Sequence, residues 1–318
     1  MKKLFVILLL MCLILTGCGT KALDEAKEAV VAYNAEAAWI NDLITPYNDA
    51  VQSVISANSA VTDAINQAQD VINKGEEPYD QNTLVALKNA MIAAQEALVP
   101  NPEIISPFEM LEVKEGMKSK ELKELKETAT SGVEKMNSFS EPTVPEIPDY
   151  SEFLSNLASA KEAYEDSIQG LKQITAPTDE FVMSRLQRID TITEMAPVTE
   201  DHDPNNKLNK QGGYIGCIYF RDLRVDWSKV TVSPGKDKND VIDIGNDGGG
   251  AIEIYANTQD AVARDTYISN LGSSGLFVKA GSHVVAGTLL VRTSDELTGT
   301  QQKQLTEDII NALIAVDK

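Results

Sequence analysis

The chain has 318 residues, of which 48 are acidic and 28 are basic, so its formal net charge at pH 7 is −20. This acidic balance argues against nucleic acid as a partner and against close docking of the folded part on an anionic membrane surface, because like charges repel. The length is sufficient for two domains, since a domain typically takes about 100 to 200 residues.

The first residues have the pattern of an export signal. Two lysines precede an apolar run over residues 4–15, which is too short to cross a membrane comfortably, and the run ends in Leu15-Thr16-Gly17-Cys18. These four residues resemble the lipobox of bacterial lipoproteins. The resemblance implies a signal peptide over residues 1–17, cleavage after Gly17, and a diacylglyceryl group on Cys18. Two acyl chains hold a protein stably to a membrane, so Cys18 is expected to be the membrane anchor.

The remaining cysteines carry no predicted chemistry. Cys12 leaves with the leader and Cys18 carries the lipid, so Cys217 is alone in the mature chain and no internal disulfide is expected. Cys217 lies in an apolar, strand-like run over residues 214–220, which predicts a buried and unreactive thiol.

Residues 21–74 are predicted to be helical, because apolar residues recur at intervals of three and four. Thr45-Pro46 is a restart signal, since Thr is a common N-cap and Pro a common first helical residue. Either two helices or one kinked helix is therefore expected. A further helix, capped by Asp80 or Asn82, is predicted to extend to Leu98.

The stretch over residues 65–98, with its Pro78-Tyr79 turn between two helices, resembles the FIVAR-type helical repeats of bacterial surface proteins. The resemblance implies an extracellular spacer and transfers no binding residue.

The next segments predict how the domains are divided. A highly charged stretch over residues 113–135 is typical of a solvated helix, and the prolines over residues 141–150 predict an extended linker. The expected organisation is a signal peptide at 1–17, a helical bundle or hairpin spacer at 18–140, the linker at 141–150 and a head at 151–318.

The head is predicted to open with two helices, capped by Ser151 and Thr178, and to continue with strands. The predicted strands cover residues 191–199, 214–220, 251–256 and 283–292. In the third, apolar residues alternate with Glu253 and Tyr255, the pattern of a half-buried strand.

A helix is predicted after each of the last two predicted strands. Thr258 is expected to cap a helix that ends at Gly272, and Thr298 with Gln301 is expected to form the capping box of a last helix. The expected fold class is α+β: a helical spacer, then a small α/β head with a mainly antiparallel sheet of about four strands and helices packed on it.

Three stretches of this half resemble a C-terminal domain of uncharacterised lipoproteins and surface proteins of Gram-positive bacteria. They cover residues 199–214, 252–255 and 281–294. That family has no assigned activity, so the resemblance implies a location and a fold class and does not imply a reaction.

The candidate metal site is the loop that contains Asp201, Asp203 and Asn205, because oxygen ligands at alternate positions of a tight loop can converge on Ca²⁺. The EF-hand pattern is incomplete. Asn206 can replace the usual glycine, but Gly212 stands where a bidentate Glu is required. A polar turn held by side-chain hydrogen bonds explains the same residues without a cofactor, so both interpretations stay open.

Other motifs predict no catalytic or cofactor-binding residue. The glycine-rich run over residues 245–250 precedes a strand and lacks a GK[ST] signature, so a flexible connection is expected instead of a phosphate loop. His202 and His283 belong to no recognised metalloprotease or hydrolase signature, and His283 is interpreted as structural or surface-exposed.

The sequence thus predicts a surface lipoprotein, anchored to the extracytoplasmic face of the cell membrane through Cys18, that binds an extracellular or cell-wall partner without catalysis. Two alternatives stay open. One is a cell-wall or glycan-acting hydrolase with paired carboxylates, for which no diagnostic spacing is visible. The other is a solute-capture lipoprotein, which usually needs two α/β lobes around a cleft, whereas one lobe is predicted here.

Overall fold

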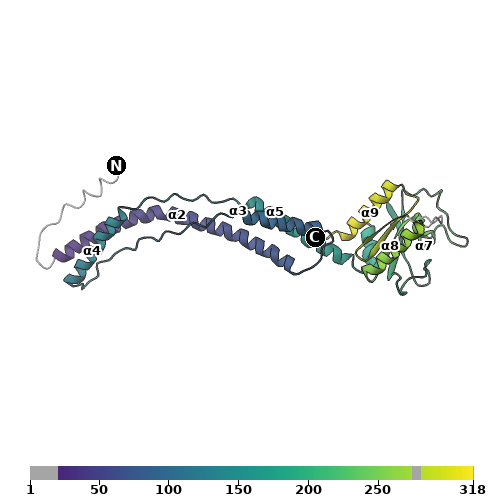
Figure 1. Cartoon of the computed structure of the whole chain (residues 1–318), viewed down its shortest axis with the longest axis horizontal. Coiled ribbons are helices and arrows are strands. Elements are labelled where there is room, and N and C mark those ends of the chain that lie inside the picture. The colour runs from purple at the N-terminus through teal and green to yellow at the C-terminus, as the bar shows by residue number, and fades with distance from the viewer. Residues whose placement is uncertain (1–20, 274–280, 318) are drawn as a thin grey trace. The chain divides into compact units, whose positions relative to one another are not determined.

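The computed structural model describes residues 21–273 and 281–317 (Figure 1). They group into two compact units. The first contains the described residues up to Asp63 together with 95–152, and the second contains 64–94 and the described residues from Phe153 onward. The predicted signal peptide and Cys18 lie outside the described residues. Among the described helices, none combines the length and the apolar character that a membrane span requires.

The second unit includes residues 64–94, which the sequence had assigned to the spacer. Its internal contacts give the reason. The backbone N–H of Tyr79 donates to the carbonyl of Ser167 at 3.0 Å, and the Tyr164 hydroxyl donates to the carbonyl of Glu76 at 3.2 Å. Lys172 also pairs with Glu76 at 2.6 Å. The turn around residues 76–80 is therefore held by the helix that leads into the head.

Helix α2 (Lys21–Asn73) is continuous, with Pro46 inside it. Of the two alternatives, two helices or one, the structure has one. Pro46 is exposed, so the carbonyl group that loses its partner through the missing proline N–H can bind water. At 1.5 Å per residue the helix is about 80 Å long.

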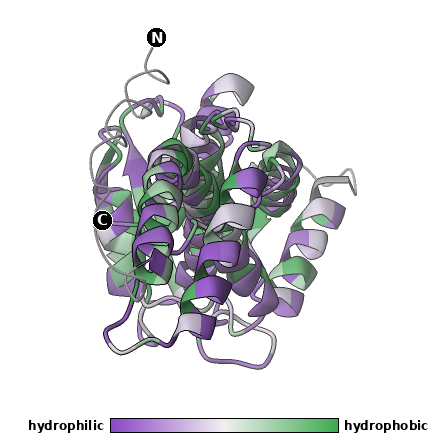
Figure 2. Ribbon diagram, turned by 90° about the vertical axis from the view of Figure 1, so that its left-hand side faces the viewer, coloured by the Kyte–Doolittle hydropathy of each residue, from purple (hydrophilic) through white to green (hydrophobic). Residues whose placement is uncertain are grey.

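The first unit is built on the N-terminal part of α2, on α4 (Ser119–Met136) and on non-helical chain over residues 98–113. Its core joins one face of α2 to α4. The buried residues of this core are Val30, Tyr33, Ala37, Ile40, Ile44, Ala129 and Met136. Figure 2 shows hydrophobic and hydrophilic residues alternating along the helical ribbons in the foreground.

Three further helices agree with the predicted ones to within a few residues. They are α3 (Gln81–Ala97), α5 (Ser151–Gln173) and α6 (Asp179–Leu186). Asp80 and Thr178 act as the expected caps: Asp80 Oδ1 accepts from the N–H of Asn82, and Thr178 Oγ1 accepts from the N–H of Phe181.

The described part of the second unit contains a five-stranded antiparallel sheet, which confirms the α+β class (Figure 1). The strands are β1 (Ile192–Pro197), β2 (Gly216–Asp222), β3 (Gly249–Ile254), β4 (Ser282–Ala286) and β5 (Leu289–Thr293), in the spatial order β1-β2-β3-β5-β4. The prediction of one strand over 283–292 was wrong. Gly287, at φ 60°, turns the chain, so that this run forms the β4–β5 hairpin.

Both faces of the sheet are covered. On one face, Ile218, Phe220, Ile252 and Val291 pack with α6 and with α9 (Gly299–Ile314). On the other, Cys217, Ala251 and Tyr255 pack with α7 (Val241–Ile244) and α8 (Thr258–Ser273). Every residue of β3 is buried, so the prediction of a half-buried strand was wrong. Glu253 and Tyr255 are buried with the rest, and Cys217 is buried as expected.

The glycine-rich run over 245–250 has regular secondary structure and is closely packed, so the prediction of a flexible connection was wrong. It forms a 3₁₀ turn (Gly245–Gly248) and the start of β3. A Cβ atom on Gly250 would lie 2.2 Å from the carbonyl oxygen of Arg292 and 2.5 Å from the Phe220 ring. Glycine is needed there because neighbouring strands and a ring approach the backbone closely.

Of the caps predicted for the last two helices, one is confirmed and one is wrong. The capping box of Thr298 and Gln301 is confirmed at the start of α9. For α8, the side chain that accepts from the Asp260 N–H belongs to Asn257, whereas the Thr258 hydroxyl donates to the carbonyl of Gly287. Thr258 is therefore not the cap, because its hydroxyl is used to hold the β4–β5 turn.

Candidate functional site

The loop between β1 and β2 is organised by the carboxylate of Asp203. One oxygen accepts from the N–H of Asn205 at 2.9 Å and from the Tyr214 hydroxyl. The other accepts from the N–H groups of Lys207 and Leu208 at 2.5 and 2.7 Å. Partial burial alone would raise the pKa of Asp203, but these four donors hold it below its ordinary value. Asp203 therefore stays ionised and fixes the loop.

The predicted calcium ligands do not act as one group in this structure. Asp201 is exposed, the Asp203 oxygens are engaged by four donors, and the Asn205 amide donates to the Tyr219 hydroxyl at 3.0 Å. This is the hydrogen-bonded turn of the second interpretation. A calcium ion at Asp201, Asp203 and Asn205 would have to displace the donors of Asp203, and its binding stays a prediction.

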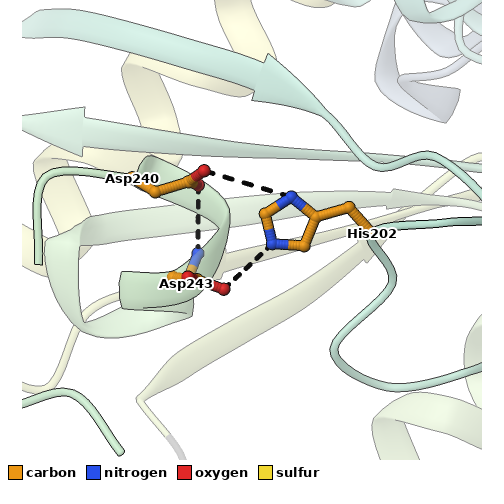
Figure 3. Close-up of side chains that lie close together, drawn as sticks. All are labelled: His202, Asp240 and Asp243. Atoms are coloured by element: carbon orange, nitrogen blue, oxygen red, sulfur yellow. Dashed lines mark hydrogen bonds and ion pairs between the residues drawn. The ribbon is translucent and has the colours of Figure 1, made fainter. Parts of the chain in front are cut away.

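A different cluster joins this loop to α7. His202, Asp240 and Asp243 each offer a ligand atom, and these atoms lie within 4.8 Å of one another. The imidazole faces both carboxylates from one side (Figure 3), with Nε2 2.9 Å from Asp243 Oδ1 and Nδ1 4.0 Å from Asp240 Oδ2. The described residues thus contain one acidic and histidine cluster with the donor types of a metal site.

This cluster already contains a positive charge. Lys236 Nζ lies 2.7 Å from the same Asp243 oxygen that contacts His202, and the N–H of Asp237 donates to the other oxygen at 2.9 Å. Hydrogen bonds from Asp237, Lys236 and His202 hold the pKa of Asp243 well below its ordinary value. The cluster therefore fastens the loop to α7, and a metal ion would have to replace Lys236.

Sequence reasoning missed this cluster because its members lie about forty positions apart. One local signal was available. Asp240 caps α7 by accepting from the N–H groups of Ile242 and Asp243, and an Asp before a short apolar run is a recognisable helix start. Nothing in the sequence, however, brings His202 to that helix.

A buried ion network lies on the α8 face of the sheet. The Glu253 carboxylate is fully buried and accepts from the Tyr255 hydroxyl at 2.7 Å, from Arg264 Nε at 3.1 Å and from Arg292 Nη1 at 3.0 Å. A second pair lies on β4 and α8, where His283 Nδ1 is 2.6 Å from Asp265 Oδ1. His283 thus has a structural partner, in line with its interpretation.

A pocket of about 280 Å³ opens beside this network. The lining residues are Lys207, Gly212, Gly213, Tyr214, Tyr255, Ala263, Arg264 and Tyr267. Three parts of the second unit contribute them: the β1–β2 loop, the end of β3 and α8. The Arg264 guanidinium lies 5.6 Å from the centroid of the Tyr267 ring, a cation–π arrangement at the exposed wall.

Asp203 and two glycines shape the loop side of the pocket. Tyr214, which donates to Asp203, is fully buried and lines the pocket. A Cβ atom on Gly213 would lie 2.0 Å from the carbonyl oxygen of Lys207, and Gly212 has φ +68°. Any side chain at position 213 would collide with the Lys207 backbone. The tight fold of the loop that places Lys207 at the pocket therefore requires glycine there.

Two tyrosines of the pocket and the nearby Cys217 thiol are held in their protonated forms. Burial, together with the neighbouring carboxylates, raises the pKa values of Tyr214 and Tyr255, so both hydroxyls stay protonated at neutral pH. Burial likewise raises the pKa of the Cys217 thiol, and this thiol is inert as predicted. None of these three groups can serve as a base or an activated nucleophile at neutral pH.

Comparisons of the chain with protein-family models, with curated proteins and with solved structures found no match. The function is therefore argued from the residues and the geometry alone.

Proposed function

We propose that the protein is a lipoprotein, anchored to the extracytoplasmic face of the cell membrane through Cys18, whose head binds an extracellular or cell-wall partner without catalysis. The carrying observation is the position of the lipobox-like Leu15-Thr16-Gly17-Cys18 directly before α2, which begins at Lys21. An anchor there is joined to about 80 Å of continuous helix.

Charge and site chemistry support the same proposal. Two acyl chains hold a protein stably, because each buried methylene contributes about 0.8 kcal/mol. The net charge of −20 repels an anionic membrane surface, so the lipid tethers the protein while the folded part is held away. In the head, the pocket is lined by two basic residues, Lys207 and Arg264, and by tyrosines, which suits recognition of a ligand.

The anchor is tested by replacing Cys18 with Ala and labelling cells with a palmitate analogue. Cys12→Ala is the matched control, because Cys12 is also in the leader but outside the lipobox-like sequence. Cys18→Ala is expected to lose the label and to leave the membrane fraction, whereas Cys12→Ala is expected to keep both. Labelling and membrane recovery of Cys18→Ala at the level of the parent chain would refute the anchor.

Divalent cation binding in the head is a second candidate function, favoured by the His202, Asp240 and Asp243 cluster (Figure 3). One imidazole and two carboxylates are the donor set of Zn²⁺ and related ions, whereas Ca²⁺ prefers oxygen ligands alone. The calcium proposal therefore belongs to Asp201, Asp203 and Asn205, and a zinc-type ion belongs to the cluster. Substitution of His202 by Ala separates the two, because it removes a ligand of the second site only.

A further inference from the structure

We propose that the pocket between the β1–β2 loop and α8 binds a small organic anion, namely a carboxylate or phosphate group carried on a sugar-sized ring. The proposal deepens the proposed binding function and rests on it for the noncatalytic use of the head. It names the class of ligand, which neither the lipobox resemblance nor the fold specifies.

The first argument is the sign of the charge. Of the eight residues that line the pocket, Lys207 and Arg264 are basic and none is acidic, in a chain whose net charge is −20. The nearest carboxylate of the ion network, on Glu253, is buried behind the wall and is shared by Arg264 and Arg292. A second carboxylate, on Asp203, accepts from the pocket tyrosine Tyr214. Two negative charges therefore face three positive ones, and the excess positive charge favours an anion in the pocket.

The second argument is that Arg264 is already positioned. Its Nε and Nη2 atoms donate to Glu253 at 3.1 and 3.4 Å, and its side chain is 20% exposed. A guanidinium group has five N–H donors, so three are not used in these two bonds. A fixed guanidinium loses little conformational entropy when it binds a carboxylate or phosphate, and its planar donors match both groups.

The third argument is the shape and the nature of the walls. A volume of about 280 Å³ is close to the lower end of ligand pockets, which suits one ring with one charged substituent. The hydroxyl protons of Tyr214 and Tyr255 are donated to Asp203 and Glu253, and both side chains are almost completely buried, so they back the wall without offering a donor to a ligand. Tyr267, which is 54% exposed, adds a ring at the entrance. Aromatic rings beside cations recognise a ligand that has both an apolar ring face and a negative charge.

The test is calorimetric titration of the purified protein with three probes that share one ring: glucuronate, glucose 6-phosphate and uncharged glucose. Inorganic phosphate is the probe for the anion without a ring. At least one charged sugar is expected to bind more tightly than glucose and than inorganic phosphate, and comparison of the two charged sugars decides between carboxylate and phosphate.

Two exposed positions connect the binding to this pocket. Lys207→Ala and Tyr267→Ala should each weaken the charged sugar by about tenfold, the loss expected for one charge-assisted hydrogen bond or one ring contact. Lys303→Ala is the matched control, because Lys303 is a basic residue on α9 whose side chain is 78% exposed and which does not line the pocket. Arg264→Lys keeps the charge beside Glu253 and should still weaken binding, since it loses the planar donors.

The proposal is overturned by any of three results. They are no binding of either charged sugar at about 10 mM, a concentration at which even very weak affinity is visible; equal binding of glucose; or equal losses in Lys207→Ala and Lys303→Ala. The titration needs no membrane. Failure here therefore leaves the anchoring result for Cys18 intact, and loss of the anchor leaves the titration unaffected.

Discussion

Asn41 on α2 binds both backbone polar groups of Phe108, which lies 67 positions later in the chain. Its Nδ2 donates to the Phe108 carbonyl at 2.8 Å, and the Phe108 N–H donates to its Oδ1 at 2.8 Å. The pair Asn34 and Leu111 repeats this arrangement. Asn48 and Ile105 repeat it again. Each asparagine amide thus pairs with the N–H and the carbonyl of one residue in the non-helical chain, as a neighbouring β-strand would.

The spacing of these pairs follows from geometry. Seven helical residues rise about 10.5 Å, and three residues of extended chain span about 9 to 10 Å, so asparagines at every seventh position meet every third residue. The next pair in the series would be Ile55 with Pro102. Isoleucine has no side-chain amide and proline has no N–H, so the regular spacing is interrupted there. Asn58 Nδ2 then donates to the Val99 carbonyl at 2.8 Å.

We predict that Asn41→Ala destabilises the protein by about 1 to 3 kcal/mol, because it leaves the N–H and carbonyl of Phe108 without their partner. Urea unfolding of the purified protein measures the change. Gln52→Ala is the control, since Gln52 is an exposed polar residue on the same helix. Equal effects of the two substitutions would show that the pairs contribute nothing to stability.

We predict that Glu253→Gln costs about 3 to 5 kcal/mol, because it leaves Arg264 and Arg292 facing each other without a counter-charge in a buried position. Thermal unfolding provides the measurement. Glu307→Gln removes an exposed carboxylate, 53% exposed and paired with Lys303, and should change stability by less than about 0.5 kcal/mol. An unchanged melting temperature for Glu253→Gln would contradict the network as described.

We predict that Gly250→Ala destabilises the protein by about 1 to 3 kcal/mol, since its methyl group would overlap the Arg292 carbonyl and the Phe220 ring. Gly299→Ala is the same substitution at the start of α9, where no atom lies within 4 Å of the new Cβ. That variant should be neutral or slightly more stable. The prediction fails if both variants melt at the same temperature.

Asp317 should make stability depend on pH in the acidic range. Hydrogen bonds from Arg188, at 2.7 and 2.8 Å, and one from the buried Arg185 lower its pKa from 3.8 to about 2. A carboxylate whose pKa is lowered in the folded state stabilises it fully above its ordinary pKa. We therefore expect the contribution to be complete above about pH 4 and to be lost as the pH falls through 2.

The measurement is the difference in unfolding free energy between the parent chain and Asp317→Asn as a function of pH. The parent chain should have the larger unfolding free energy above pH 4, and the difference between the two chains should shrink as the pH falls toward 2. In an Arg188→Gln background the same substitution should have a smaller effect, because the first partner is absent. A difference that does not vary with pH would refute this contribution.

We predict that Lys236→Gln strengthens Zn²⁺ binding, because it removes the ammonium group that competes for Asp243 Oδ1. At ten times Kd, bound metal adds about 1.4 kcal/mol to stability, which a thermal shift detects. His202→Ala should abolish the shift, and Lys229→Gln, at an exposed lysine away from the cluster, should leave it unchanged. A stronger response to Ca²⁺ than to Zn²⁺ that is erased by Asp201→Asn with Asp203→Asn would instead locate the cation in the loop.

Local signals made several elements predictable. The caps at Asp80 and Thr178 and the capping box of Thr298 and Gln301 could be read from the sequence, because each bond joins residues two or three positions apart. The amphipathic periodicity of α2 and the β-branched runs predicted helix and strand for the same reason. Backbone preference and side-chain spacing act over a few residues, so the sequence by itself determined the class of fold and most element boundaries.

Only the tertiary structure decided which distant groups meet. Glu253 and Tyr255 alternate with apolar residues as on a half-buried strand, yet α8 covers them, because Arg264 supplies the charge that makes burial of Glu253 tolerable. His202 reaches Asp243 across 41 positions, and Asn34 reaches Leu111 across 77. The free energy of such contacts depends on the folding of the compact unit that contains both partners, so no short stretch of sequence carries the signal for them.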